Sequence, residues 1–195
     1  MQYTKTVSLK DGRSCIVRNG TQRDAQAVLS NFILTHGQTD FLTTYPDETS
    51  FTLEQEEAYL QRKVTSEREV ELVAEVDGEI VGTARVDLIR AAEKTRHRAS
   101  FGISIDRAFS GIGIGRALTE ACIACAKAAR YVQLELEVVA ENQTAINLYQ
   151  SVGFVEYGRN PKGFHSRSGG WQEIVLMYLE LNGSMENRVI KMNQE

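Results

Sequence analysis

Apolar and polar residues alternate along much of this chain, and the period of the alternation changes from segment to segment. A period of two residues is typical of strands that bury one face. The dipeptides Asp11-Gly12 and Asp77-Gly78 lie between such segments and predict the turns of two hairpins. The strands are expected within residues 3–18 (the first hairpin) and at 70–77, 79–89, 99–105, 131–139, 154–158 and 171–181.

A period near 3.6 residues predicts four helices. Thr21 and Thr52 are expected to be N-caps of the first two, with Asp24 and Gln55 three residues later as in a capping box. The other two are expected over about residues 113–130 and from Asn142 to Gly153. The residues expected to face the core from the first two helices are Ala25, Val28, Leu29, Phe32, Ala58, Tyr59 and Val64.

The order of these elements predicts an α/β fold whose sheet is mixed but mostly antiparallel. The strand 99–105, the glycine-rich turn after it, the third helix and the strand 131–139 form a β-α-β unit, which implies one parallel strand pair. Residues 1–181 are expected to form a single domain, residues 159–170 a loop within it, and residues 182–195 a polar tail.

Composition and charge are those of a globular protein and argue against some partners and locations. The chain has 195 residues, 42% of them hydrophobic, and a formal charge of −4 with a pI of about 5.5. It contains no apolar run long enough for a membrane span, and residues 1–14 lack the apolar core of a signal sequence, so a cytoplasmic location is expected. The negative charge argues against a nucleic-acid partner. Cys122 and Cys125 have helical core spacing, and no second Cys/His pair completes a zinc site, so no metal is expected.

The segment FSGIGIGRAL, residues 109–118, follows a predicted strand and opens a predicted helix. The first N–H groups of a helix lack intrahelical acceptors, and glycines let a phosphate approach them closely. One glycine would suffice for a tight turn, so three favour a bound anion. A Walker loop is excluded because no lysine follows, and a dinucleotide fingerprint fails because its third glycine position holds Arg116 or Leu118.

Three segments resemble the GCN5-related N-acetyltransferases. The run from Ser110 to Gly115 is similar to that family's pyrophosphate loop, LELEVVAENQTAINLYQSVGF to its strand, asparagine and A-x-x-L-Y-x-x-x-G-F helix, and AEVDGEIVGTARV to its central hairpin. The resemblance covers about residues 14–180. Ser110 stands where the family usually has Arg or Gln, so a charge-assisted phosphate contact is lost, and Arg116 is the expected substitute.

The resemblance implies an acyl-CoA N-acyltransferase fold with helices on both faces of the sheet. It implies acetyl-CoA as co-substrate, in a cleft where the strand 99–105 splays from the strand 132–139. The residues implied for the pantetheine arm are Ile103, Ser104 and Ile105. Those implied for the pyrophosphate are Ser110, Gly111, Ile112, Gly113, Ile114, Gly115 and Arg116. Asn142 and Tyr149 would flank the thioester.

The resemblance also implies direct acyl transfer from acetyl-CoA to a primary amine in a ternary complex. Tyr149 matches the motif position of the acid that protonates the leaving thiolate. Where some relatives carry a basic glutamate this chain has Ala99, so the base stays open between His97, Glu75, Asp87 and a water chain. Glu135 and Glu137 alternate with buried leucines, and of two placements, facing the acceptor or on a solvated strand face, the solvated face is expected.

The acceptor and its partners stay open as well. Residues 37–61 carry six carboxylates and no Lys or Arg, whereas the loop at 159–170 carries basic side chains, so a small amine, an amino acid and a protein N-terminus or lysine all remain. A homodimer is compatible with the resemblance. The alternative functions are a non-catalytic acyl-CoA-binding or sensing module and a different kind of nucleotide-binding protein.

Overall fold

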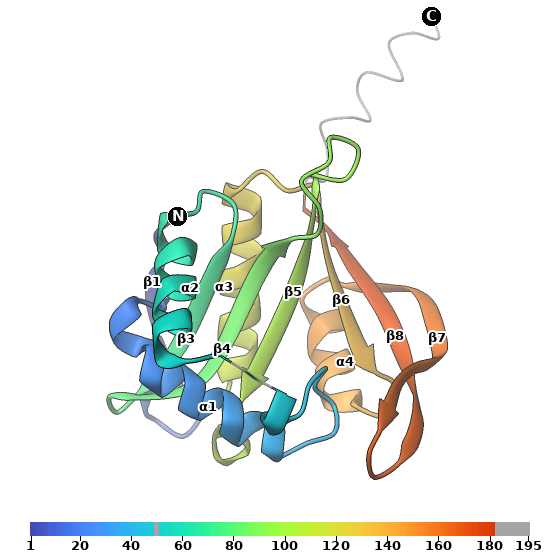
Figure 1. Ribbon diagram of the computed structural model, residues 1–195, viewed down its shortest axis with the longest axis horizontal. Coiled ribbons are helices and arrows are strands. Elements are labelled where there is room, and N and C mark those ends of the chain that lie inside the picture. The colour runs from blue at the N-terminus through green and yellow to red at the C-terminus, as the bar shows by residue number, and fades with distance from the viewer. Residues whose placement is uncertain (49–50, 182–195) are drawn as a thin grey trace, which may run out of the picture.

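The strands form one mixed sheet in the order β1-β2-β3-β4-β5-β6-β8-β7 (Figure 1). The structure, a computed structural model, describes residues 1–48 and 51–181, so the expected tail at 182–195 lies outside the described residues. The strands are β1 (Thr4–Ser8), β2 (Ser14–Asn19), β3 (Val70–Val76), β4 (Glu79–Leu88), β5 (Arg98–Ile105), β6 (Gln133–Val139), β7 (Val155–Ser166) and β8 (Gly170–Glu180).

The helices of the described residues cover both faces of this sheet, as the sequence predicted. They are α1 (Ala25–Gly37), α2 (Leu53–Thr65), α3 (Ile114–Ala128) and α4 (Gln143–Ser151), with short 3-10 turns η1 (Gln22–Asp24), η2 (Pro46–Glu48) and η3 (Arg107–Phe109). On one face Val28 and Leu60 pack with Val73 of β3. On the other, Cys122 of α3 packs into the main core with Leu72. None of these helices is long and apolar enough to cross a bilayer.

The parallel pair is β5 with β6, and it is short. Arg98–Ser100 pairs with Gln133–Glu135, while every other strand pair of the sheet is antiparallel. Beyond this paired end the two strands diverge, and α4 is visible behind the opening (Figure 1). The mixed sheet and its single parallel pair are therefore confirmed, and the divergence opens the sheet near its middle.

The predicted turns and caps form as their chemistry requires. Gly12, Asp77 and Gly78 all have positive φ angles (90°, 52° and 84°), the conformation that the hairpin dipeptides favour. Thr52 caps α2 by accepting a hydrogen bond from the N–H of Gln55, whose side chain reciprocates. The capping box at Thr21 also forms, although the helix begins with the 3-10 turn η1.

The inner faces of α1 and α2 differ from the prediction. Ala58 is exposed, and Leu29, Phe32, Tyr59 and Val64 are only half-buried. The fully buried positions include the polar residues Asn31, Thr35, His36, Glu56 and Lys63. The reason is that these helices lie over a sheet face that itself carries charged side chains, so polar groups rather than apolar ones meet there.

The predicted loop at residues 159–170 is also wrong for most of its length. β7 continues to Ser166 and pairs with β8 through two irregularities, one of them between Asn160 and Phe164. Pro161 lies inside that irregularity, where a missing N–H does not interrupt a ladder. The result is a long hairpin whose turn lies far from the paired end of β5 and β6.

Candidate active site

The glycine-rich turn places two glycines in left-handed backbone and uses the third for packing. Gly111 and Gly113 have φ angles of 79° and 112°, and a Cβ added to either would meet no atom within 4 Å. At Gly115 an added Cβ would lie 3.2 Å from Leu148 Cδ2 of α4 and 3.4 Å from Ile105 Cδ1. Close packing against Leu148 and Ile105 therefore accounts for the missing side chain at Gly115.

Within residues 1–48 and 51–181, backbone donors at the same turn have no acceptor. Gly113 is the N-cap of α3 and has no side chain to cap it. The first hydrogen bond of the helix runs from Ala117 N–H to Gly113 C=O (3.1 Å), so the N–H groups of Ile114, Gly115 and Arg116 precede it. Uncapped donors at the positive end of a helix, next to open space, form a cradle for an anion.

The two polar side chains at this turn take different positions. Ser110 is exposed at the start of the turn. Arg116 donates to Ser151 Oγ at the end of α4 (2.8 Å) and pairs with Glu120 (3.4 Å). The guanidinium that was expected to replace the missing basic residue is thus engaged by α4 and by its own helix.

Backbone groups of β5 alternate between its two neighbouring strands. On one side Asp106 N–H donates to Val81 C=O (2.8 Å), and on the other His97 C=O accepts from Val132 N–H (2.9 Å). Alternation therefore directs the backbone groups of odd-numbered residues toward β6. Past Ser100 no strand of the described part of the chain pairs with this edge, so the backbone groups of Phe101, Ile103 and Ile105 line the opening.

Ser104 has the opposite orientation from its two neighbours. Like Asp106, which bonds Val81, it is even-numbered, so its backbone groups face β4 rather than the opening. Of the three residues expected to hold the pantetheine arm, only Ile103 and Ile105 present their main chain to the opening. The sequence predicts the strand 103–105 but not which of its residues direct their N–H and C=O groups toward the unpaired edge, because that depends on the neighbouring strands.

Tyr149 lies at the α3/α4 side of the opening. Its side chain is 7% exposed, and its ring centroid is 6.0 Å from that of Phe101 and 5.9 Å from that of Phe154. Burial raises its pKa to about 12. Its hydroxyl has no hydrogen-bond partner among residues 1–48 and 51–181. Asn142 caps α4 by accepting from Ala145 N–H (3.2 Å), which ties the start of that helix to the end of β6.

The side chains considered as the base do not converge on Tyr149. His97 is exposed at the closed end of the β5–β6 pair, where its C=O accepts from Val132 and Gln133. Glu75 of β3 pairs with Arg18 (2.7 Å), and Asp87 of β4 pairs with buried Lys63. The structure brings none of these three to the opening beside the tyrosine.

Glu137 lies in the part of β6 that is not paired with β5, and so at the opening. The neighbouring residues Leu136 and Val138 are buried on one face, so Glu137 projects from the other, and it is exposed. Glu135, two residues earlier, is buried and held by Arg98. The alternation in LELEV indicated a polar face, but only the end of β5–β6 pairing at Ser100 and Glu135 shows that Glu137 lies where the two strands diverge.

The loop after α1 contacts the turn of the β7–β8 hairpin. The contacting residues, here called the clasp, are Asp40, Tyr45, Asp47, Ser166, Arg167 and Ser168. Asp47 and Arg167 form an ion pair (2.8 Å), and the guanidinium lies 4.0 Å from the Tyr45 ring centroid. The acidic and basic segments expected to form two opposing walls therefore neutralise part of each other's charge.

The sequence of this chain is similar to those of known proteins. Residues 33–154 match the family model described as the Acetyltransferase (GNAT) family. The chain belongs to this family. It is similar to the L-amino acid N-acetyltransferase AaaT of Escherichia coli (strain K12), with 32% identity over 108 residues, which are 55% of this chain and 65% of AaaT. The match thus spans slightly less than two thirds of that relative.

Solved structures agree with the GNAT assignment. A GNAT acetyltransferase from Streptococcus pneumoniae superposes with a TM-score of 0.81 and 27% identity, covering 85% of this chain and 99% of that one. The structure of yncA from Salmonella typhimurium, which contains its cofactor acetyl-CoA, has a TM-score of 0.76 and 20% identity, with coverages of 87% and 95%. The latter supports the fold.

This GNAT chain also carries an ionic network on the α1/α2 face, between α2 and the strands β3 and β4. The Tyr59 hydroxyl donates to buried Glu71 (2.9 Å), and Lys63 pairs with Asp87. Burial raises the pKa of Glu71 to about 7, while the nearby charge of Arg85 acts in the opposite direction. A carboxyl group in this network therefore gains its charge near neutral pH.

Replacing Glu71 with Gln is expected to stabilise this GNAT domain at high pH. The folded chain keeps the proton up to about pH 7 and the unfolded chain loses it near pH 4.5, so the stability due to this group is lost as the pH rises through that range. Gln has no proton to lose. Urea unfolding at pH 8 should give a free energy of unfolding about 1–3 kcal/mol above wild type, with a smaller gap at pH 5.

The matched control is Glu75→Gln, four residues further along the same face of β3. That change breaks the pair with Arg18 and should lower the free energy of unfolding at both pH values. Equal pH dependence of stability in wild type and Glu71→Gln would contradict a buried Glu71 that titrates near neutrality.

Proposed function

We propose that this chain is an acetyl-CoA-dependent N-acetyltransferase that acts by direct attack of a primary amine on the thioester. The observation that carries the proposal is the uncapped start of α3, which lies next to the unpaired edge of β5. The cradle supplies donors for a pyrophosphate, and the strand edge supplies donors and acceptors for an amide-containing arm. Family membership and the acetyl-CoA in the yncA structure support the same ligand.

The cradle and the strand edge would bind different parts of acetyl-CoA. Main-chain N–H groups of Gly111, Gly113 and the first turn of α3 would hold the pyrophosphate, with the Ser110 hydroxyl beside it. Ile103 and Ile105 would bond the pantetheine arm as an added strand does. Asn142, which positions α4, would keep Tyr149 next to the thioester sulfur.

Two side chains on opposite faces of the opening would handle the protons. A primary amine has an ordinary pKa near ~10.4, so it must lose a proton before it attacks, and Glu137 is placed to accept it directly or through water. The amine nitrogen then bonds to the thioester carbon, the carbon–sulfur bond breaks, and the nitrogen gives its second proton to solvent as it becomes the amide. Tyr149, whose raised pKa keeps it protonated at neutral pH, would donate its proton to the departing sulfur.

The experiment that tests this function separates binding from turnover. Acetyl-CoA at 100 times its Kd should raise the free energy of unfolding by about 2.7 kcal/mol. Release of free thiol should then be measured across a panel of amines with wild type and with Glu137→Gln, which should bind acetyl-CoA normally but turn over about 10²-fold more slowly. Glu135→Gln is the matched control, because that carboxylate is already paired with Arg98.

The outcomes distinguish the proposal from its rivals. Stabilisation by acetyl-CoA without thiol release for any amine would indicate an acyl-CoA sensor. Stabilisation by ATP or NAD but not by acetyl-CoA would indicate another kind of nucleotide-binding protein. Wild-type turnover in Glu137→Gln would remove Glu137 from the mechanism and leave a water chain as the base.

A further inference from the structure

Arg85 occupies an uncommon place for an exposed cation. It lies in β4, an interior strand of the sheet, yet its side chain is 49% exposed. Its guanidinium crosses to the neighbouring strand β5 and lies over Gly102, where an added Cβ would be 3.3 Å from Arg85 Cζ. Glycine at this position leaves the room that the guanidinium occupies.

The guanidinium keeps most of its hydrogen-bonding capacity. Its Nε lies 3.2 Å from Asp87 Oδ2, and Asp87 is already paired with Lys63. Glu71, which faces Arg85 across the β3–β4 pair, is bonded by the Tyr59 hydroxyl. Among the residues that the structure describes, the two terminal nitrogens of Arg85 have no hydrogen-bond partner. A planar fork with both terminal nitrogens available matches a carboxylate.

The register of the sheet places this fork beside the opening. Gly102 pairs with Arg85 on one side, and it lies two residues beyond Ser100, the last residue of β5 that pairs with β6. Glu137 likewise lies two residues beyond Glu135, the last residue of β6 that pairs with β5, so Gly102 and Glu137 lie on the two strands just where they begin to diverge. Ser100, Gly102, Glu135 and Glu137 share one sheet face by the alternation of side chains. Arg85 and Glu137 therefore border the opening from opposite strands and on the same face.

We propose that Arg85 binds a carboxylate of the acceptor, so that the acceptor is a small α-amino acid. This inference rests on the proposed function. In an α-amino acid the amine and the carboxylate are separated by one carbon, so a carboxylate on Arg85 holds the amine at the opening between Arg85 and Glu137. A protein N-terminus carries an amide where the carboxylate would be, and a polyamine brings only positive charge toward the guanidinium.

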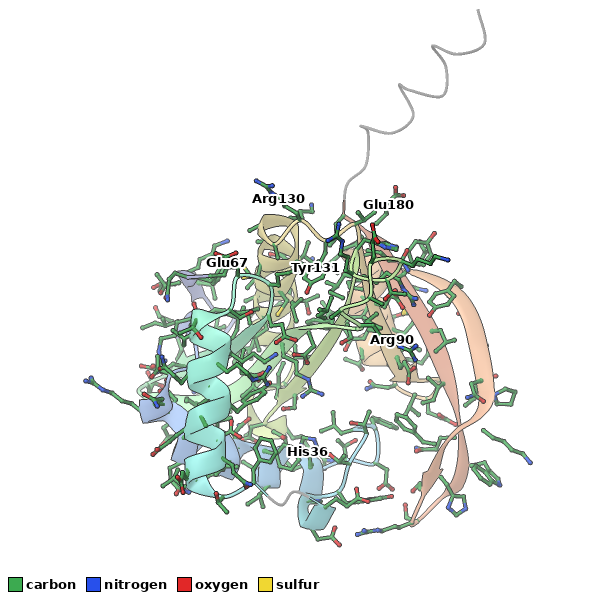
Figure 2. All side chains as sticks on the ribbon, turned by 45° about the horizontal axis from the view of Figure 1, so that its top comes forward. His36, Glu67, Arg90, Arg130, Tyr131 and Glu180 are labelled. Carbon is green, nitrogen blue, oxygen red and sulfur yellow. The ribbon has the colours of Figure 1, made fainter. Side chains whose placement is uncertain are left out.

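The clasp supports a small acceptor. Its contacts join the loop after α1 to the β7–β8 turn, for instance through the Arg167 N–H, which donates to the Tyr45 hydroxyl (2.7 Å). Figure 2 shows His36 at the same end of the molecule. His36 is buried and packed on Phe32 (3.7 Å between ring centroids) next to this loop. A protein acceptor would have to pass its following residues beneath the clasp, whereas a free amino acid has no following residues.

The test compares each L-amino acid with its own carboxamide. Wild type should prefer the acid in kcat/KM, and Arg85→Gln should reduce the ratio of acid to carboxamide by about 10- to 100-fold, the effect of losing a charge-assisted bidentate contact. Arg85→Lys should reduce it by less, because it keeps the charge and loses the fork. The fraction of folded enzyme cancels within each ratio, and the difference in intrinsic reactivity between the two amines cancels when the ratio of a variant is compared with that of wild type.

Arg90, exposed in the loop between β4 and β5 and labelled in Figure 2, provides the matched control. Arg90→Gln should leave the ratio at its wild-type value. An unchanged ratio in Arg85→Gln, or a collapse of the ratio in Arg90→Gln instead, would overturn the assignment to Arg85. Wild-type thiol release with carboxamides and amines but with no amino acid would overturn the acceptor class while leaving acetyl transfer intact. Absence of thiol release with every amine would contradict the proposed function itself.

Discussion

Replacing Tyr149 with Phe is expected to lower kcat by about 10²-fold while leaving acetyl-CoA affinity within about twofold of wild type. The change removes the Tyr149 hydroxyl proton and preserves the aromatic ring, which packs against Phe101 and Phe154. Without that proton the sulfur must leave as a thiolate. Single-turnover release of thiol, with calorimetric titration of acetyl-CoA, measures both quantities.

Tyr131 offers a matched control for the loss of a buried phenol. It is fully buried, its hydroxyl also has no partner among the described residues, and Figure 2 shows it at the end of the molecule opposite His36. Tyr131→Phe should keep wild-type turnover. Equal turnover in Tyr149→Phe and wild type would remove the acid role, and equal losses in both variants would indicate an effect on packing rather than on proton transfer.

Replacing Gly113 with Ala is expected to weaken acetyl-CoA binding by at least about 10-fold. At φ = 112° an L-residue is strained by about 1–2 kcal/mol, so the backbone relaxes and turns the first N–H groups of α3 away from the bound anion. No atom lies within 4 Å of the added Cβ, so steric contact within the protein does not explain the loss. Titration calorimetry with acetyl-CoA gives the affinity, and urea unfolding gives the stability.

Gly78→Ala imposes a similar strain elsewhere. Gly78 has φ = 84°, has equally open surroundings and lies in the β3–β4 turn. This variant should lose comparable stability and keep wild-type affinity for acetyl-CoA. Equal affinity in the Gly113 and Gly78 variants would show that the start of α3 does not hold the cofactor.

Local features of the fold could be predicted because their causes lie within a few residues of sequence. The turns at Asp11-Gly12 and Asp77-Gly78 need only positive φ angles, and the caps at Thr52 and Asn142 need only a side-chain oxygen next to free N–H groups. The inward faces of α1 and α2 could not be predicted in the same way. Burial there depends on the charged sheet face that the helices cover, which is formed by strands far along the chain.

The candidate site shows the same division. The sequence by itself determined the glycine turn at the start of α3, the strand that precedes it, and the helix that carries Tyr149, because short-range backbone chemistry specifies each of them. Only the tertiary structure decided which edge of β5 is open, that Glu137 and Arg85 border the opening, and that His97 lies at its closed end. The reason is that these relations depend on where two parallel strands stop pairing, and the packing of helices on both faces of the sheet sets that point.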